Sequence, residues 1–161
     1  MSAKSGQAGP VTSKGEAGPA EVAELLLVAV AVAEGAVIGV WLGAFPALAL
    51  RAGGFPPAPL FFVRWAGVLH LLLGFGYGLE WLRFRRVTLL VSAKALTALF
   101  LTATLFGEGL PALMSTALVF ELLMAVAGAL LHGPADRSRR ARARLRLVGS
   151  DAKQIRPAGQ R

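Results

Sequence analysis

The sequence predicts an all-α fold, a polytopic membrane protein built as an antiparallel bundle of four transmembrane helices. The composition is 55% hydrophobic with a mean hydropathy of +0.61, which is above the range of soluble globular domains. Four apolar runs of about 18–24 residues match the ~20 residues that a helix needs to cross ~30 Å of hydrocarbon. The charged residues, 16% of the chain, gather mainly at the two ends and in one short loop.

The first 20 residues are small, polar and rich in Gly, Pro and Ser. Such a composition cannot bury enough apolar surface to order itself, so we expect residues 1–20 to be a disordered or partner-bound cytoplasmic lead. The first span follows at about 21–43 and carries Gly35, Gly39 and Gly43, two overlapping GxxxG motifs. Small residues four apart let another backbone approach closely, which predicts a helix contact inside the bundle or with a partner subunit.

Residues 44–60 form the longest connection, where several Gly and Pro residues break the helix but the composition stays apolar. A short interfacial helical turn is expected around 47–51. The second span, about 61–82, reads FFVRWAGVLHLLLGFGYGLEWL and has His70 near its middle. Arg83, Arg85 and Arg86 follow it at once.

The third and fourth spans are expected at about 87–106 and 110–132, giving a transmembrane domain over residues 21–132. The links 83–86 and 107–109 are very short, so the last three spans are predicted to be sequential antiparallel neighbours. Residues 133–161 form a basic tail. Lys and Arg concentrate at both termini and in the 83–86 turn, which predicts that both termini are cytoplasmic in a multi-pass protein of the cell inner membrane.

Each predicted span holds one ionisable residue at depth: Glu34, His70, Lys94 and Glu121. Such a residue at the bilayer centre costs roughly 2.5–3.5 kcal/mol on insertion scales and is a candidate for function. At a rise of 1.5 Å per residue, side chains from all four helices can meet at one level. One interpretation is structural, with Lys94 paired to Glu34 or Glu121 to set helix register. The other is a ligand pocket or proton-handling site that faces a small amphipathic or quinone-like molecule.

The candidate cofactors follow from the same residues. No set of catalytic residues stands in a usable context, and a chain with no cysteine offers no thiolate nucleophile or Cys-ligated metal or iron–sulfur site. A bis-histidine haem is not expected, because His132 lies at a helix end whereas His70 is central. The spacing Ala66-x-x-x-His70 leaves ligation of a chlorophyll-type pigment open. Quinone and lipid remain candidate ligands.

The basic tail contains a run of arginines whose role depends on its position beside a span: Arg137, Arg139, Arg140, Arg142, Arg144 and Arg146. Next to the bilayer, each basic residue gains ~1 kcal/mol from anionic headgroups. The same arginines would equally dock an acidic protein subunit. We expect no nucleic-acid partner.

Four short spans, the second helix FVRWAGVLHLLLGFGYGLEW and the basic turn after it resemble the DoxX-like four-helix membrane proteins over roughly residues 22–132. That resemblance implies a link to quinone-dependent redox complexes. The arginine-rich tail and the Ala/Gly-rich lead depart from the pattern and suit docking. The leading functional prediction is therefore a non-catalytic accessory subunit of a larger redox or energy-converting membrane complex. The alternative is a membrane protein or enzyme that binds a quinone or another small hydrophobic ligand at the Glu/His/Lys site.

Overall fold

The computed structural model describes residues 17–107 and 111–154, with side chains described as far as residue 144. Most of the predicted lead, residues 1–16, lies outside the described part. The fold is all-α, as predicted. Its helices are α1 (Pro19–Ala44), α2 (Pro46–Ala52), α3 (Leu60–Phe84), α4 (Thr88–Gly107) and α5 (Ala112–Gln154). The short α2 occupies the position of the predicted interfacial turn.

Local sequence explains where several helices begin and end. α1 starts at Pro19, whose missing N–H would be unpaired in the first turn anyway, and Glu21 places a negative charge near the helix N-terminus. α3 ends where Arg85 turns left-handed (φ 53°) and its N–H donates to the Trp81 carbonyl at 2.9 Å. The Glu80 carboxylate then accepts the N–H of Leu89 at 2.9 Å and satisfies an N-terminal donor of α4.

Four helices are long and apolar enough to cross a membrane: Pro19–Ala44, Leu60–Phe84, Thr88–Gly107 and Ala112–Arg144. Large hydrophobic side chains cover their outer faces, with Leu96 67% exposed and Phe106 85% exposed. A surface so extensively apolar is unfavourable in water and suits lipid. The chain is a multi-pass integral membrane protein.

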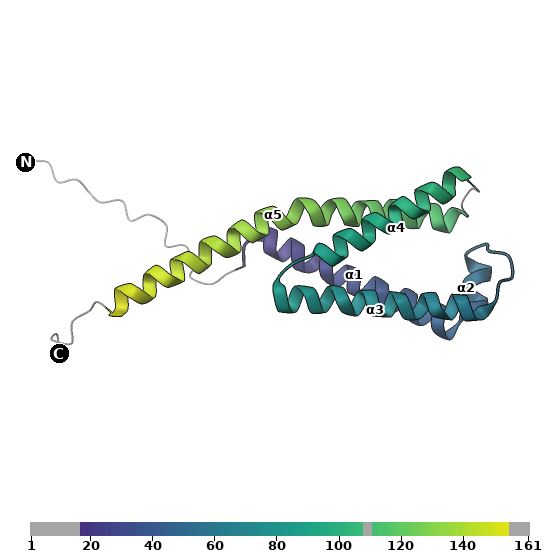
Figure 1. Cartoon of the computed structure of the whole chain (residues 1–161), viewed down its shortest axis with the longest axis horizontal. Coiled ribbons are helices and arrows are strands. Elements are labelled where there is room, and N and C mark those ends of the chain that lie inside the picture. Colours follow the sequence, from purple (N-terminus) through teal and green to yellow (C-terminus); the bar gives the residue numbers. More distant parts are fainter. Residues whose placement is uncertain (1–16, 108–110, 155–161) are drawn as a thin grey trace, which may run out of the picture.

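The helices pack as two pairs (Figure 1). α1 packs along α3, α4 packs along α5, and the contact between α1 and α5 joins the pairs. α3 and α4 meet mainly near their shared turn, where Leu89 comes up against Gly76. The last three spans follow one another in the bundle as predicted, but α3 and α4 touch mainly at their turn and do not pack along their lengths. A short link holds two helix ends together but leaves their axes free to diverge. In addition, the face of α3 that could pack along another helix is already covered by α1.

A glycine seam holds the first pair together. A Cβ built on Gly35 would lie 2.9 Å from the His70 carbonyl oxygen, and one on Gly39 would lie 2.9 Å from that of Gly67. A Cβ on Gly67 would in turn meet the Gly43 backbone nitrogen at 2.7 Å. Gly43 itself has open space where a Cβ would stand. The predicted glycine contact thus lies inside the bundle, and at Gly43 only its backbone takes part.

The core lies toward one end of the bundle, where Val28, Ala31, Tyr77, Leu90 and Met124 are buried together. This is the end at which α1 begins, α3 turns into α4, and α5 continues outward (Figure 1). We call it the tail end. At the opposite end, which carries α2, the two helix pairs stand apart (Figure 1).

The last helix runs further than expected. The fourth span was predicted to end near residue 132, but α5 continues through Pro134 to Gln154. Pro134 lacks one N–H and therefore removes one backbone hydrogen bond, yet the following Ala, Arg and Leu residues are strong helix formers. Two of the arginines also contact α1, as described below, which holds the extension against the bundle.

Candidate functional site: a buried charge cluster beside an intramembrane cavity

Lys94 of α4 lies between two carboxylates from different helices. Its Nζ donates to Glu34 Oε2 of α1 at 2.5 Å and to Glu121 Oε1 of α5 at 2.8 Å. The lysine is only 6% exposed and Glu121 is also buried. The pairing that the sequence predicted is therefore present with both carboxylates at once. These two bonds connect α4 with α1 and with α5.

The fourth candidate residue, His70, does not join this cluster by a hydrogen bond. Its Nδ1 contacts the Ala66 carbonyl oxygen one turn earlier on α3, at 2.8 Å. Because a carbonyl oxygen only accepts, Nδ1 carries the proton, and in the neutral ring Nε2 is left as an acceptor. Small residues on the α3 face, Gly67 and Gly74, let the backbone around His70 approach α1.

A cavity brings the four residues together. It has a volume of about 200 Å³, and its lining includes Glu34, His70, Lys94 and Glu121 together with Tyr77 and Thr97. The Thr97 hydroxyl donates to the Ala93 carbonyl oxygen at 3.0 Å and is thus already used. All four polar residues selected from the sequence therefore border one space, although only three of them are linked directly.

The cavity offers two hydrogen-bond acceptors to a bound group. Glu121 Oε2 is buried with no hydrogen-bond partner among the described residues, and His70 Nε2 adds a second acceptor. The cluster also contains two carboxylates and one ammonium group. A buried acceptor without a partner is costly, so this site favours a bound group that donates a hydrogen bond.

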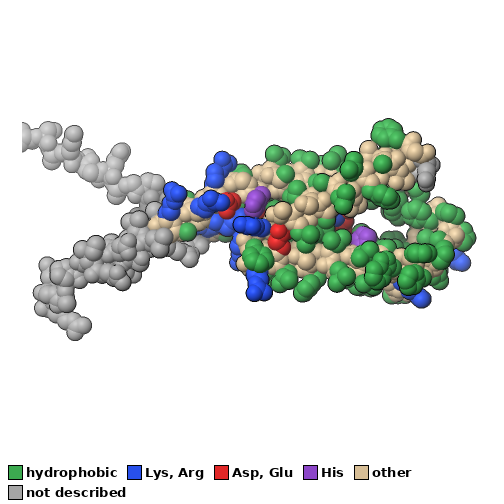
Figure 2. Space-filling view, viewed as in Figure 1, with side chains coloured by type: hydrophobic (Ala, Val, Ile, Leu, Met, Phe, Trp, Pro, Cys, Tyr) green, Lys and Arg blue, Asp and Glu red, His purple; other side chains and the backbone are tan. Residues whose placement is uncertain are grey.

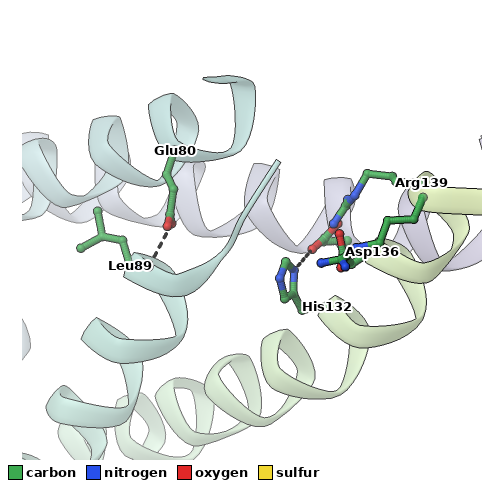
Figure 3. Close-up of polar contacts among 7 residues, drawn as sticks. Glu80, Leu89, His132, Asp136 and Arg139 are labelled. Carbon is green, nitrogen blue, oxygen red and sulfur yellow. Dashed lines mark hydrogen bonds and ion pairs between the residues drawn. The ribbon is translucent and has the colours of Figure 1, made fainter. Parts of the chain in front are cut away.

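A second buried acid was not among the predicted site residues. Glu24 of α1 is 0% exposed and is held by two groups of α5. It accepts a hydrogen bond from His132 Nδ1 at 2.8 Å and forms an ion pair with Arg139 (Figure 3). Its four-residue spacing to Val28, on the buried face of α1, was the signal available in the sequence.

The arginines of the tail divide into two groups. Arg139 pairs with Glu24 and Arg142 pairs with Glu21, so both bind the chain's own α1 and do not serve only headgroups or a partner. Arg137, Arg140 and Arg144 are exposed, with Arg140 paired to Asp136 at 2.8 Å. The Arg146 side chain lies outside the described residues. Figure 2 shows basic side chains gathered where α5 leaves the bundle, in contrast to the apolar surface over the spans.

Comparisons of this chain with protein-family models, curated proteins and solved structures found no match. The DoxX-like resemblance stays a prediction, supported only by the four long apolar helices. Among the described residues, no three His, Cys, Asp or Glu side chains gather in a way that would hold a metal ion.

Proposed function

We propose that this membrane protein binds the polar head of a small amphipathic molecule in the cavity beside Lys94. The observation that carries the proposal is Glu121, whose buried Oε2 has no hydrogen-bond partner among the described residues and whose side chain lines the same cavity as His70. Strongly polar side chains within a span are costly and by default functional. A purely structural ion pair does not require a cavity beside it, and close packing around the pair would stabilise it better.

The size of the cavity limits what it holds. Pockets that enclose whole drug-sized ligands measure ~300–1,000 Å³, whereas this one is about 200 Å³. It suits a single ring or head group, with an apolar chain lying between the separated helix pairs. A complete pigment macrocycle at His70 is too large for this cavity, so a pigment is not among the ligands we propose.

The head group we favour is a hydroquinone. Its two hydroxyl groups donate to the free acceptors, Glu121 Oε2 and His70 Nε2, and each hydroxyl also accepts from Lys94 or Tyr77. The oxidised quinone has only acceptors and leaves Glu121 Oε2 without a donor. Selectivity for the reduced form thus follows from the hydrogen-bond inventory of the cavity. We therefore favour quinone binding over the role of an accessory subunit.

The test compares decylubiquinol with decylubiquinone on the full-length protein in mild detergent, by quenching of the fluorescence of its three tryptophans. We expect the quinol to bind more tightly. Glu121→Gln should weaken quinol binding roughly ten- to hundredfold, because a hydrogen bond to a charged group is worth about 1.5–3 kcal/mol. Glu80→Gln is the matched control, since Glu80 lies at the α3–α4 turn and does not line the cavity. Equal binding of both forms, or equal loss in both variants, would overturn the proposal.

A second candidate is the accessory subunit, and one observation favours it. α5 projects beyond the bundle at the tail end (Figure 1), and its arginines at 137, 140 and 144 are exposed, an arrangement suited to docking an acidic subunit. The glycine seam no longer supports this function, because α3 already occupies it. Purification of the native protein in mild detergent separates the candidates. Stoichiometric co-purifying subunits support docking, and a lone protein with a bound lipid-like molecule supports the cavity.

A further inference from the structure

A polar pocket lies at the tail end and shares no lining residue with the cavity beside Lys94. It measures about 480 Å³ and is walled by the α3–α4 turn on one side and by α5 on the other. Its lining consists mostly of charged and polar side chains: Arg85, Arg86, Thr88, His132, Asp136, Arg139 and Arg140. Figure 3 shows His132, Asp136 and Arg139 close together near the start of α4, with the Glu80 side chain directed at Leu89.

The charges around this pocket do not balance. Four arginines line it, whereas Asp136 is the one acid in its wall. Asp136 pairs with Arg140 at 2.8 Å, and the buried Glu24 behind the wall pairs with Arg139. Arg85 and Arg86 have no carboxylate in the wall left to pair with. The pocket is therefore positive, and an anion that enters it meets guanidinium groups from two different elements.

Two of these arginines, Arg139 and Arg85, have features that favour anion binding. The Nη2 of Arg139 is buried and has no hydrogen-bond partner among the described residues, so it is a donor in need of an acceptor. Arg85 lies over the Trp81 ring at 4.0 Å, and its backbone is left-handed (φ 53°). Stacking holds the guanidinium in place, and planar guanidinium groups bind phosphate in bidentate fashion.

An apolar hollow adjoins the same arginines. Arg85 and Arg139 also line a space of about 680 Å³ whose wall includes Val22, Leu25 and Trp81. A free phosphate ion gains no binding energy from an apolar surface, whereas a phospholipid can place its phosphate at the arginines and its acyl chains along the helices. Basic pockets between membrane helices are known to bind anionic headgroups. We propose that the tail-end pocket is a binding site for the phosphate of an anionic phospholipid.

The test measures lipid retention by native mass spectrometry of the full chain in detergent, with phosphatidylglycerol and phosphatidylcholine present in equal amounts. Wild-type protein should retain phosphatidylglycerol. Arg86→Gln and Arg85→Gln should each weaken retention about fivefold, since a basic residue near anionic lipid contributes about 1 kcal/mol. Arg86 is exposed and its side chain forms no ion pair with any described residue, so its replacement should leave the fold intact even where Arg85→Gln lowers the yield.

The controls are Arg83→Gln and Arg137→Gln, which remove the same charge from residues outside the pocket wall. These two variants should retain lipid as the wild type does. Equal losses in pocket and control variants would mean general attraction of a basic surface and would overturn the site. A further arm adds inorganic phosphate and follows thermal unfolding. Stabilisation by phosphate equal to that by phosphatidylglycerol would overturn the assignment to a lipid.

Discussion

Replacement of Lys94 by methionine is the most direct test of the charge cluster. Methionine keeps nearly the same length but removes the ammonium group that lies 2.5 Å from Glu34 and 2.8 Å from Glu121. The variant leaves two carboxylates in the interior with no cation between them. We expect Lys94→Met to lower the free energy of unfolding more than either Glu34→Gln or Glu121→Gln alone, because each glutamine variant still leaves the lysine one partner.

The magnitude follows from the geometry. At 2.8 Å and an effective dielectric constant of ~20, Coulomb's law gives an attraction of about 6 kcal/mol for one pair. Desolvation of both ions offsets much of that attraction, and the measured cost of breaking a buried pair is about 3–5 kcal/mol. We therefore expect a loss in this range for Lys94→Met. The triple variant with Lys94→Met, Glu34→Gln and Glu121→Gln carries no charge in this cluster and should be more stable than Lys94→Met alone.

The assay is reversible unfolding in mixed micelles of a mild detergent and dodecyl sulfate, followed by circular dichroism. Leu96→Met is the matched control, since this residue of α4 is 67% exposed and a methionine there faces detergent. It should unfold like the wild type. Double-mutant cycles between Lys94 and each carboxylate should give coupling free energies well above the ~0.5 kcal/mol scatter of independent sites.

Additive losses in both cycles would contradict a shared charge cluster. A triple variant less stable than Lys94→Met would contradict it as well. Either result would mean that the three groups do not share their charge. Strong coupling combined with unchanged quinol binding in Glu121→Gln would instead leave a structural ion-pair cluster and remove the proposed function. Stability and ligand binding thus separate the two interpretations that the sequence left open.

Three further predictions concern the rest of the bundle. Gly39→Leu should prevent the close approach of α1 to α3 and reduce folded yield severalfold, whereas Val40→Leu, at a site 54% exposed, should not; equal yields would dismiss the glycine seam. Glu24→Ala should cost about 3–5 kcal/mol in detergent unfolding, because it leaves the Arg139 guanidinium without its carboxylate and the His132 ring without its hydrogen-bond acceptor; a loss below 1 kcal/mol would contradict this pairing. Reporter fusions at Arg161 and Gly109 should report opposite sides of the membrane, with Arg161 cytoplasmic, and an external Arg161 would reverse the predicted orientation.

The glycine motif illustrates why pairing was harder to predict than the spans. Three glycines four residues apart on the first span predicted a close contact, and the contact exists at Gly35 and Gly39. The motif did not say whether the partner was α3, another helix or another subunit. The answer required the complementary glycines of α3, Gly67 and Gly74, to come into register with it, and register between distant segments is a property of the packed bundle.

The ion pairs of the basic tail were also not predictable from local sequence. Arginines after a span were interpreted through their neighbours in sequence, as groups for headgroups or an acidic partner. In the bundle, Arg139 and Arg142 instead meet acids more than a hundred residues earlier in the chain. These pairs also help the helix to continue past Pro134, where the local pattern predicted an end.

The sequence by itself determined the number of spans, the approximate ends of the first three, and which spans carry Glu34, Lys94 and Glu121. Those properties are local, because hydropathy over ~20 residues decides insertion and each residue advances the helix by 1.5 Å. The tertiary structure alone decided that α1 pairs with α3, that α3 and α4 diverge, and that a cavity opens beside the charges. These features depend on how each helix is rotated and which faces meet, and both result from close packing among residues far apart in the chain.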